Sequence, residues 1–143
     1  MKQSYKIMII DDNPKNLKIL GEMLGLNGYE IYSFNNGETA YKAAQKNIPD
    51  LILLDICMPV IDGYELCSIF KSNKILKGIP IIFLSALNSM EDKVNAFKKG
   101  GADYITKPFQ IEEIEVRVKT HLKISEMQKM VEKENERLER MVT

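Results

Sequence analysis

The stretch that decides the fold is "PDLILLDICMPVIDGYE", residues 49–65, in which a continuous apolar run ends on a single acid, Asp55. Such a run is typical of a parallel strand that is covered on both faces. Pro59 and Gly63 follow, so the chain is expected to turn soon after the acid. Asp55 therefore either begins a turn, as aspartate commonly does, or performs chemistry, and the rest of the sequence has to decide.

Three further apolar runs predict buried strands of the same kind: "YKIMII" at 5–10, "IPIIFLS" at 79–85 and "ADYIT" at 102–106. The stretch "YEIYSF" at 29–34 instead alternates apolar and polar residues. Alternation is typical of a strand with one exposed face, so we expect this strand at an edge of the sheet.

Helical segments lie between these strands. The first follows "DDNPKN", where Asn13 is a candidate N-cap and Pro14 suits the first helical position. Its predicted apolar face consists of Leu17, Leu20, Met23 and Leu24. Further helices are expected near 37–47, 63–75 and 90–99. Strand and helix alternate five times, which predicts a doubly wound α/β domain with right-handed crossovers.

Length and charge restrict the class of protein. The chain has 143 residues, of which 45% are hydrophobic, enough for one domain with a real core. The 20 basic and 20 acidic residues give a formal net charge of zero, so we expect no direct nucleic-acid partner and no membrane-surface partner.

Cysteine and histidine usage restricts the compartment and the kind of metal site. The chain has two cysteines and one histidine, which predicts neither a disulfide framework nor a zinc site. No apolar run approaches the ~18 residues of a spanning helix. The sequence thus predicts a soluble cytoplasmic protein with reduced thiols.

Polar residues gather where the predicted strands end. In a doubly wound sheet these ends share one edge, where ligands bind. The residues placed there are Asp11, Asp12, Asp55, Ser85 and Lys107. Three carboxylates in one crevice repel one another unless a cation compensates them. A set of oxygen ligands favours Mg²⁺ as the cofactor.

Such a site suits phosphoryl transfer. With a cation and a phosphoryl oxygen beside it, the carboxylate of Asp55 can act as a nucleophile and form an aspartyl phosphate. The Ser85 hydroxyl and the Lys107 ammonium can then compensate the charge on the phosphoryl oxygens. Pro108 fixes the turn that orients Lys107, and a cis bond before this proline is an expectation rather than a deduction.

Four segments now resemble a known family. "IMIIDDNPKN", "LILLDICMPVIDGYE", "IIFLSA" and "GADYITKPF" look like the signature segments of receiver domains of two-component response regulators, in the family's order, across about residues 4–121. The resemblance implies five parallel strands in the order 2-1-3-4-5 flanked by five helices, of which the last is extended here. It also implies a phosphohistidine donor, on a sensor histidine kinase or a phosphotransfer protein.

Roles carry over to the matching positions. The resemblance implies that Asp55 is the phosphoacceptor and that Asp11 and Asp12 form the acidic pair, with Asp12 a direct metal ligand. It makes the backbone carbonyl of Cys57 a further ligand, so that the implied metal site comprises these four residues. Ser85 and Lys107 match the family's catalytic hydroxyl and lysine, and Ser85 with Tyr104 forms the implied switch, in which the ring turns inward. The alternative for Tyr104 is a purely structural role, as an aromatic side chain half buried on an outer strand.

Two positions vary within the family. Many receivers have a polar residue two places after the phosphoacceptor, where this chain has Cys57, and Leu87 stands two places after Ser85. Neither side chain positions water well, so we expect slow self-dephosphorylation.

A redox role for Cys57 is disfavoured beside three acids. We expect Cys67 in the core and His121 as a surface or packing residue.

The tail "FQIEEIEVRVKTHLKISEMQKMVEKENERLERMVT" has neither proline nor glycine, which predicts one long helix. An a/d frame of a heptad repeat accommodates Ile124, Met127, Val131, Leu138 and Met141, with Glu134 at one d position. The frame favours a parallel coiled-coil dimer over a solvated, fraying helix. We therefore expect a receiver domain at 1–122 and, at 123–143, a helical extension that links it to an output domain or ends a stand-alone receiver.

The sequence thus predicts a signalling switch rather than an enzyme. The expected homodimer uses the C-terminal helix or the face formed by the fourth helix, the fifth strand and the fifth helix. Two alternatives from other classes are a phosphorylation-independent interaction module and a small flavodoxin-like enzyme. The presence of Asp12, Asp55 and Lys107 disfavours the first, and the absence of a phosphate-cradling loop after the first strand disfavours the second.

Overall fold

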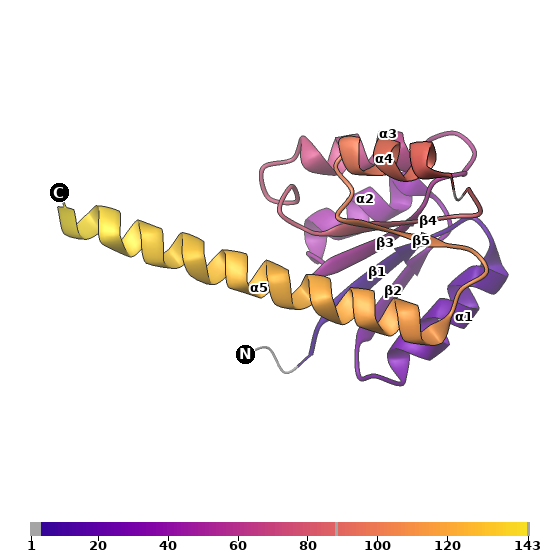
Figure 1. Ribbon diagram of the computed structural model, residues 1–143, viewed down its shortest axis with the longest axis horizontal. Coiled ribbons are helices and arrows are strands. Elements are labelled where there is room, and N and C mark those ends of the chain that lie inside the picture. Colours follow the sequence, from indigo (N-terminus) through magenta and orange to yellow (C-terminus); the bar gives the residue numbers. More distant parts are fainter. Residues whose placement is uncertain (1–3, 88, 143) are drawn as a thin grey trace.

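Five parallel strands form one sheet in the computed structural model, which describes residues 4–87 and 89–142 (Figure 1). The sheet order is β2-β1-β3-β4-β5, as predicted. The strands are β1 (Lys6–Ile10), β2 (Glu30–Phe34), β3 (Leu51–Asp55), β4 (Ile81–Ser85) and β5 (Asp103–Thr106). β3 is central and wholly buried, whereas β2 lies at an edge and stays partly exposed, which confirms the interpretation of its alternating pattern.

Five helices follow the strands: α1 (Pro14–Gly25), α2 (Gly37–Lys46), α3 (Gly63–Lys71), α4 (Met90–Lys98) and α5 (Ile111–Val142). The predicted start of α1 is confirmed, because the Asn13 side chain accepts a hydrogen bond from the Lys15 N–H and Pro14 occupies the first turn. The Asn36, Asp62 and Ser89 side chains cap α2, α3 and α4 in the same way.

α3 ends at Lys71, earlier than the predicted 75. The side chain of Asn73 accepts the backbone N–H groups of Ile75 and Leu76, at 2.9 and 3.1 Å, and so offers them an alternative to helical bonds. The Lys71 ammonium donates to the carbonyls of Lys77 and Ile79 and holds the following loop. The helix therefore stops through side-chain competition that hydrophobic periodicity does not show.

Alternate residues of the strands enter two separate cores. One core packs against α2, α3 and α4 and includes Met8, Ile10, Ile52, Leu54, Ile81 and Phe83. The other packs against α1 and α5 and includes Ile7, Ile9, Leu51, Leu53, Ile82 and Leu84. Figure 1 shows this three-layer arrangement. Burial of both sheet faces explains why the strands read as continuous apolar runs.

α5 continues far past the sheet and projects away from the other elements (Figure 1). Leu122 and Ser125 are its last buried residues, and the part beyond residue 126 is exposed. The prediction of one long helix is confirmed. None of the helices that the structure describes is both long and apolar enough to cross a membrane.

Candidate functional site at the carboxyl edge of the sheet

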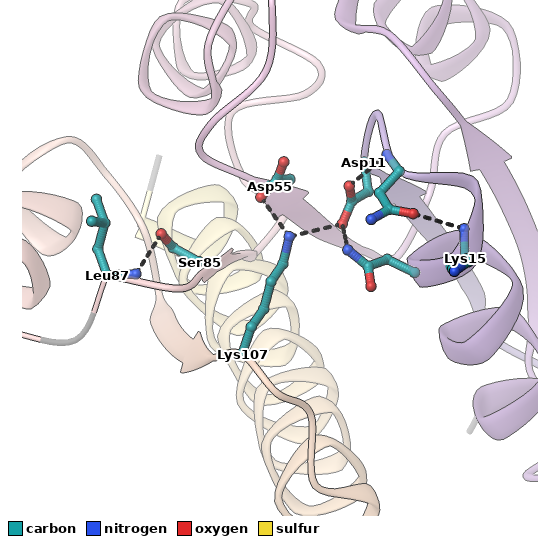
Figure 2. A network of polar contacts seen from close by, with 8 residues as sticks. Asp11, Lys15, Asp55, Ser85, Leu87 and Lys107 are labelled. Atoms are coloured by element: carbon teal, nitrogen blue, oxygen red, sulfur yellow. Dashed lines mark hydrogen bonds and ion pairs between the residues drawn. The ribbon is translucent and has the colours of Figure 1, made fainter.

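The strand register brings the predicted polar residues to one edge. Asp55 pairs with Leu84 between β3 and β4, and Ser85 pairs with Thr106 between β4 and β5. Asp11 directly follows β1, and Lys107 directly follows β5. Figure 2 shows Asp11, Asp55, Ser85 and Lys107 around one space.

Asp55 is held rigidly at the end of the buried strand, with only 3% of its surface exposed. The chain folds back against it at Gly63, whose N–H donates to the Ile56 carbonyl at 2.8 Å. A Cβ atom at Gly63 would lie 2.4 Å from the Asp55 carbonyl oxygen and 2.7 Å from the Ile56 Cα. Only glycine permits this close approach, which explains the residue at this position of the opening stretch.

Three carboxylates converge as predicted. One ligand oxygen each from Asp11, Asp12 and Asp55 lies within 4.8 Å of the others. Asp11 is fully buried and accepts the Asn13 N–H at 2.9 Å and the Asn16 side-chain amide at 3.1 Å. Asp12 is exposed. The start of α1 thus orients one acid inside the site and leaves the next at its mouth.

Lys107 reaches back into the site from the end of β5. Its ammonium donates to Asp55 Oδ1 at 3.0 Å and lies 3.3 Å from Asp11 Oδ2. The same nitrogen lies 5.9 Å from the centre of the Phe109 ring, within the range of a cation–π contact. The peptide bond before Pro108 is cis, which confirms that expectation.

The charges of the site perturb two ionisable groups. Burial is the largest influence on Asp55 and, with the charge of Asp11, outweighs the hydrogen bond from Lys107 and raises the pKa of Asp55 to about 6. Burial alone would lower the pKa of Lys107, but Asp55 and Asp11 raise it above its ordinary value. The site thus holds more negative charge than one ammonium compensates.

The residues fit a magnesium ion. The cluster offers carboxylate oxygens and no nitrogen or sulfur ligand, which is the donor chemistry that Mg²⁺ prefers. One acid of the set is solvent-exposed, which leaves room for the waters that Mg²⁺ usually keeps. Cys57 lies in the loop directly after β3, with its side chain exposed.

Ser85 and Tyr104 are joined through Leu87. Ser85 is 1% exposed, and its hydroxyl oxygen accepts the Leu87 N–H at 3.1 Å (Figure 2). The Tyr104 hydroxyl donates to the carbonyl of the same leucine in a short hydrogen bond. Tyr104 is buried rather than half buried, although it lies on β5 at an edge of the sheet. Its role in the switch stays a prediction.

Some polar residues near the site and on β5 carry no signal in the sequence pattern. Asn16 supports Asp11, and Asp103 binds both Arg117 and His121. The spacing of Arg117 and His121 places them on one face of α5, but only the fold reveals their shared partner. His121 is therefore a packing residue with a hydrogen-bond partner, which agrees with the expected structural role.

The two cysteines differ as expected. Cys67 is fully buried, its thiol donates to the Lys99 carbonyl at 3.4 Å, and burial raises its pKa. This confirms its place in the core. Both cysteines are free thiols.

Comparisons with known proteins agree with this geometry. The chain is 38% identical over 122 residues to the alkaline phosphatase synthesis transcriptional regulatory protein PhoP of Bacillus subtilis, which covers 85% of this chain and 50% of PhoP. The chain spans about half the length of the curated relatives it matches. PhoP is a transcriptional regulator by name, and about half of its length has no counterpart in the match to this chain.

Two solved structures share the fold. The receiver domain of the Francisella response regulator 1452 is 34% identical, with a TM-score of 0.79 and coverage of 85% of this chain and 98% of that one. The receiver domain of a signal transduction histidine kinase from Syntrophus aciditrophicus is also 34% identical, with a TM-score of 0.77 and coverage of 83% and 90%. The sequence model of the response regulator receiver domain matches residues 7–119. The chain therefore belongs to the response regulator receiver domain family.

Proposed function

We propose that the chain is a phosphoacceptor switch in which Asp55 takes a phosphoryl group from a phosphohistidine of a sensor histidine kinase or phosphotransfer protein. As a receiver domain it is a signalling domain rather than a classical enzyme. The observation that carries the proposal is the position of the Lys107 ammonium, 3.0 Å from Asp55 and 3.3 Å from Asp11. This arrangement fixes one buried carboxylate beside a cation and two further acids.

Transfer makes one bond and breaks another. A carboxylate oxygen of Asp55 forms a bond to phosphorus, while the P–N bond to the donor histidine breaks and its electron pair stays on the imidazole nitrogen, which takes up a proton. Asp11, Asp12, Asp55 and the Cys57 carbonyl would hold Mg²⁺, which supplies positive charge opposite the phosphoryl oxygens. Lys107 pairs with one of these oxygens, and the Ser85 hydroxyl, now bonded to the Leu87 N–H, donates to another.

The lifetime of the phosphorylated state depends on how well water is held beside Asp55. Cys57 and Leu87 are both exposed, at the two positions that flank this water in the family. Neither side chain is a strong hydrogen-bonding group, so we propose that self-dephosphorylation is slow. A phosphate-release assay that finds a lifetime of seconds would contradict this part of the proposal.

The output is proposed to involve the helical extension. We assign residues 1–122 to the receiver and residues 123–143 to a linker helix that pairs with a second copy and leads to an output domain in a longer protein. The apolar a and d side chains of the frame are between 41% and 67% exposed, so they are available for pairing.

A second candidate face for the homodimer carries exposed Met90, Val94 and Phe97 on α4 and Val116 on α5. The proposed compartment is the cytoplasm, in keeping with two free thiols.

The experiment compares Asp55→Asn with a matched control, Asp50→Asn. Asp50 is also buried but lies before β3, at the opposite edge of the sheet. With acetyl phosphate and Mg²⁺, we expect the wild-type chain and the control to gain one acid-labile phosphoryl group by intact mass spectrometry, whereas Asp55→Asn gains none. Full labelling of Asp55→Asn would overturn the proposal.

A further inference from the structure

A second polar cluster joins β5 to α5. Arg117 Nη1 donates to both carboxylate oxygens of Asp103, at 2.7 and 2.8 Å. His121 Nε2 lies 2.9 Å from Asp103 Oδ2. The side chains of Asp103 and His121 are each only 15% exposed. Asp103 therefore fixes two successive turns of α5 to the first residue of β5.

Asp103 is also bonded to the proposed switch. Its Oδ1 accepts the backbone N–H of Tyr104 at 2.8 Å. Tyr104 in turn donates its hydroxyl to the Leu87 carbonyl, and the Leu87 N–H donates to Ser85. A series of hydrogen-bonded residues thus runs from Ser85, which is expected to bind the phosphoryl group, through Leu87 and Tyr104 to Asp103 and on to α5.

The cluster depends on an ionised Asp103. Burial would raise the pKa of this carboxyl, but hydrogen bonds from Arg117, His121 and the Tyr104 N–H together hold it below its ordinary value. Hydrogen bonds to a carboxylate are short and strongly directional. Among the residues that the structure describes, the buried Arg117 Nε has no hydrogen-bond partner. The orientation of the guanidinium towards Asp103 therefore leaves one buried N–H unpaired, which costs free energy.

His121 lies at the root of the extension, which is the part of α5 where the helix leaves the body of the domain. Leu122 and Ser125, which follow it, are the last buried residues of α5, and the helix is exposed beyond Glu126. On the other side of this root, burial and, after it, the nearby Glu126 carboxylate raise the pKa of the Tyr5 hydroxyl to about 12. The root is therefore held by Asp103 on the switch strand and lies near Tyr5, just before β1, which is remote from the switch.

We infer that the Asp103 carboxylate transmits the state of Ser85 and Tyr104 to the helical extension through His121. The inference rests on the proposed function, since the phosphoryl group on Asp55 is what draws the Ser85 hydroxyl away from Leu87. Asp103 and His121 act as positioning residues and touch neither the phosphoryl group nor the metal site. Tyr5 and Glu126 lie on the other side of the root and do not carry the signal.

The test uses the full chain, with Mg²⁺ and beryllofluoride in place of the phosphoryl group, and follows backbone amide resonances by NMR. In the wild-type chain, we expect shifts at Ser85 and Leu87 and also across residues 121–126. Asp103→Asn and His121→Phe should keep the shifts at Ser85 and Leu87 while those at 121–126 fall at least about twofold. His121→Phe keeps an aromatic ring and removes the donor, so it tests the link even if Asp103→Asn unfolds.

Two further variants exclude a merely structural effect. His121→Gln presents an amide N–H at a similar distance from the backbone and should restore the response at 121–126. Glu126→Gln removes the negative charge near Tyr5 and should keep the response at residues 121–126. Full responses in Asp103→Asn and His121→Phe, or no rescue by His121→Gln, would overturn the link. A wild-type response at Ser85 without one at 121–126 would also overturn the link alone, whereas no response even at Ser85 would overturn the proposed function itself.

Discussion

Lys107 and Asp55 are 52 residues apart in sequence, yet the lysine ammonium lies 3.0 Å from the aspartate oxygen. This contact closes the site from the β5 side and offsets only part of the solvation that Asp55 loses by burial. The same ammonium lies 3.3 Å from Asp11, so one cation serves two buried acids.

Lys107→Met should therefore weaken both the fold and the chemistry. Removal of the cation leaves Asp55 and Asp11 uncompensated, which we expect to lower the free energy of unfolding in metal-free buffer at neutral pH by on the order of 1–3 kcal/mol. Urea unfolding monitored by circular dichroism measures this. Lys77→Met, which changes an exposed lysine at the opposite edge of the sheet, serves as the control. Equal stability of the two variants would contradict the role given to Lys107.

The pH dependence of stability should report the burial of Asp55. The pKa of its carboxyl is about 6 in the folded protein and ordinarily 3.8, so the folded state binds the proton more tightly. This group thus contributes stability that is present below about pH 4 and is lost as the pH rises through about 6. In EDTA, Asp55→Asn should exceed the wild-type chain in unfolding free energy by about 3 kcal/mol at pH 8.

That difference should shrink towards zero near pH 4. Urea unfolding of both chains between pH 4 and pH 8 provides the measurement. A difference that does not vary with pH would show that Asp55 is not the group responsible.

Magnesium should stabilise the fold through the acidic cluster. Ligands that bind only the folded chain stabilise it by mass action, by about 2.7 kcal/mol at a hundredfold excess over the dissociation constant. We expect Mg²⁺ to raise the Tm of the wild-type chain and to have little effect on Asp12→Asn, measured by scanning calorimetry. Asp62→Asn removes the helix-capping acid of α3 and should respond like the wild-type chain. An equal response from Asp12→Asn would contradict its assignment as a ligand.

Val60 should be replaceable with a gain in stability. Its φ is 70°, its side chain is 99% exposed, and the Ile61 N–H donates to the Pro59 carbonyl at 2.9 Å, so the valine is the centre of a three-residue turn. Positive φ at a non-glycine residue costs about 1–3 kcal/mol, whereas glycine loses ~0.5–1 kcal/mol of backbone freedom. Val60→Gly should therefore stabilise the chain by about 1 kcal/mol in urea unfolding, while Val60→Ala, which keeps most of the strain, should not.

Glu134 should limit pairing of the extension. It occupies a d position of the heptad frame and bonds to Arg137 on its own helix, at 2.6 and 3.1 Å. Glu134→Leu should strengthen dimerisation about tenfold or more, because a buried leucine replaces a charge in the interface. Sedimentation equilibrium measures the dissociation constant, and Glu136→Leu, outside the a/d frame, serves as the control. The same constant for both variants would favour a solvated helix that does not pair.

The sequence predicted the elements whose cause is local. Apolar runs identified four of the strands, an alternating pattern identified β2, and Asn13 with Pro14 marked the start of α1. The convergence of Asp11, Asp55 and Lys107 was predictable because the ends of parallel strands share one edge. The early end of α3 was not, since it depends on a single side chain, Asn73.

Contacts across the fold left no local trace. Asp103 is a single polar residue at the start of a strand, and its partners Arg117 and His121 lie on the following helix. Their meeting depends on how α5 packs against β5. The positive φ of Val60 was equally hidden, because no local pattern favours a β-branched residue at such a position.

Because α5 is one unbroken helix, a small tilt near its base produces a larger displacement at its far end. At 1.5 Å per residue, the part of the helix beyond Leu122 is about 30 Å long. A tilt of about 5° at His121 would move Val142 by about 3 Å, a displacement comparable to half a helical turn. A movement too small to disturb the core beside Tyr104 is thus large enough, at the far end, to change which side chains would meet if two such helices pair as proposed.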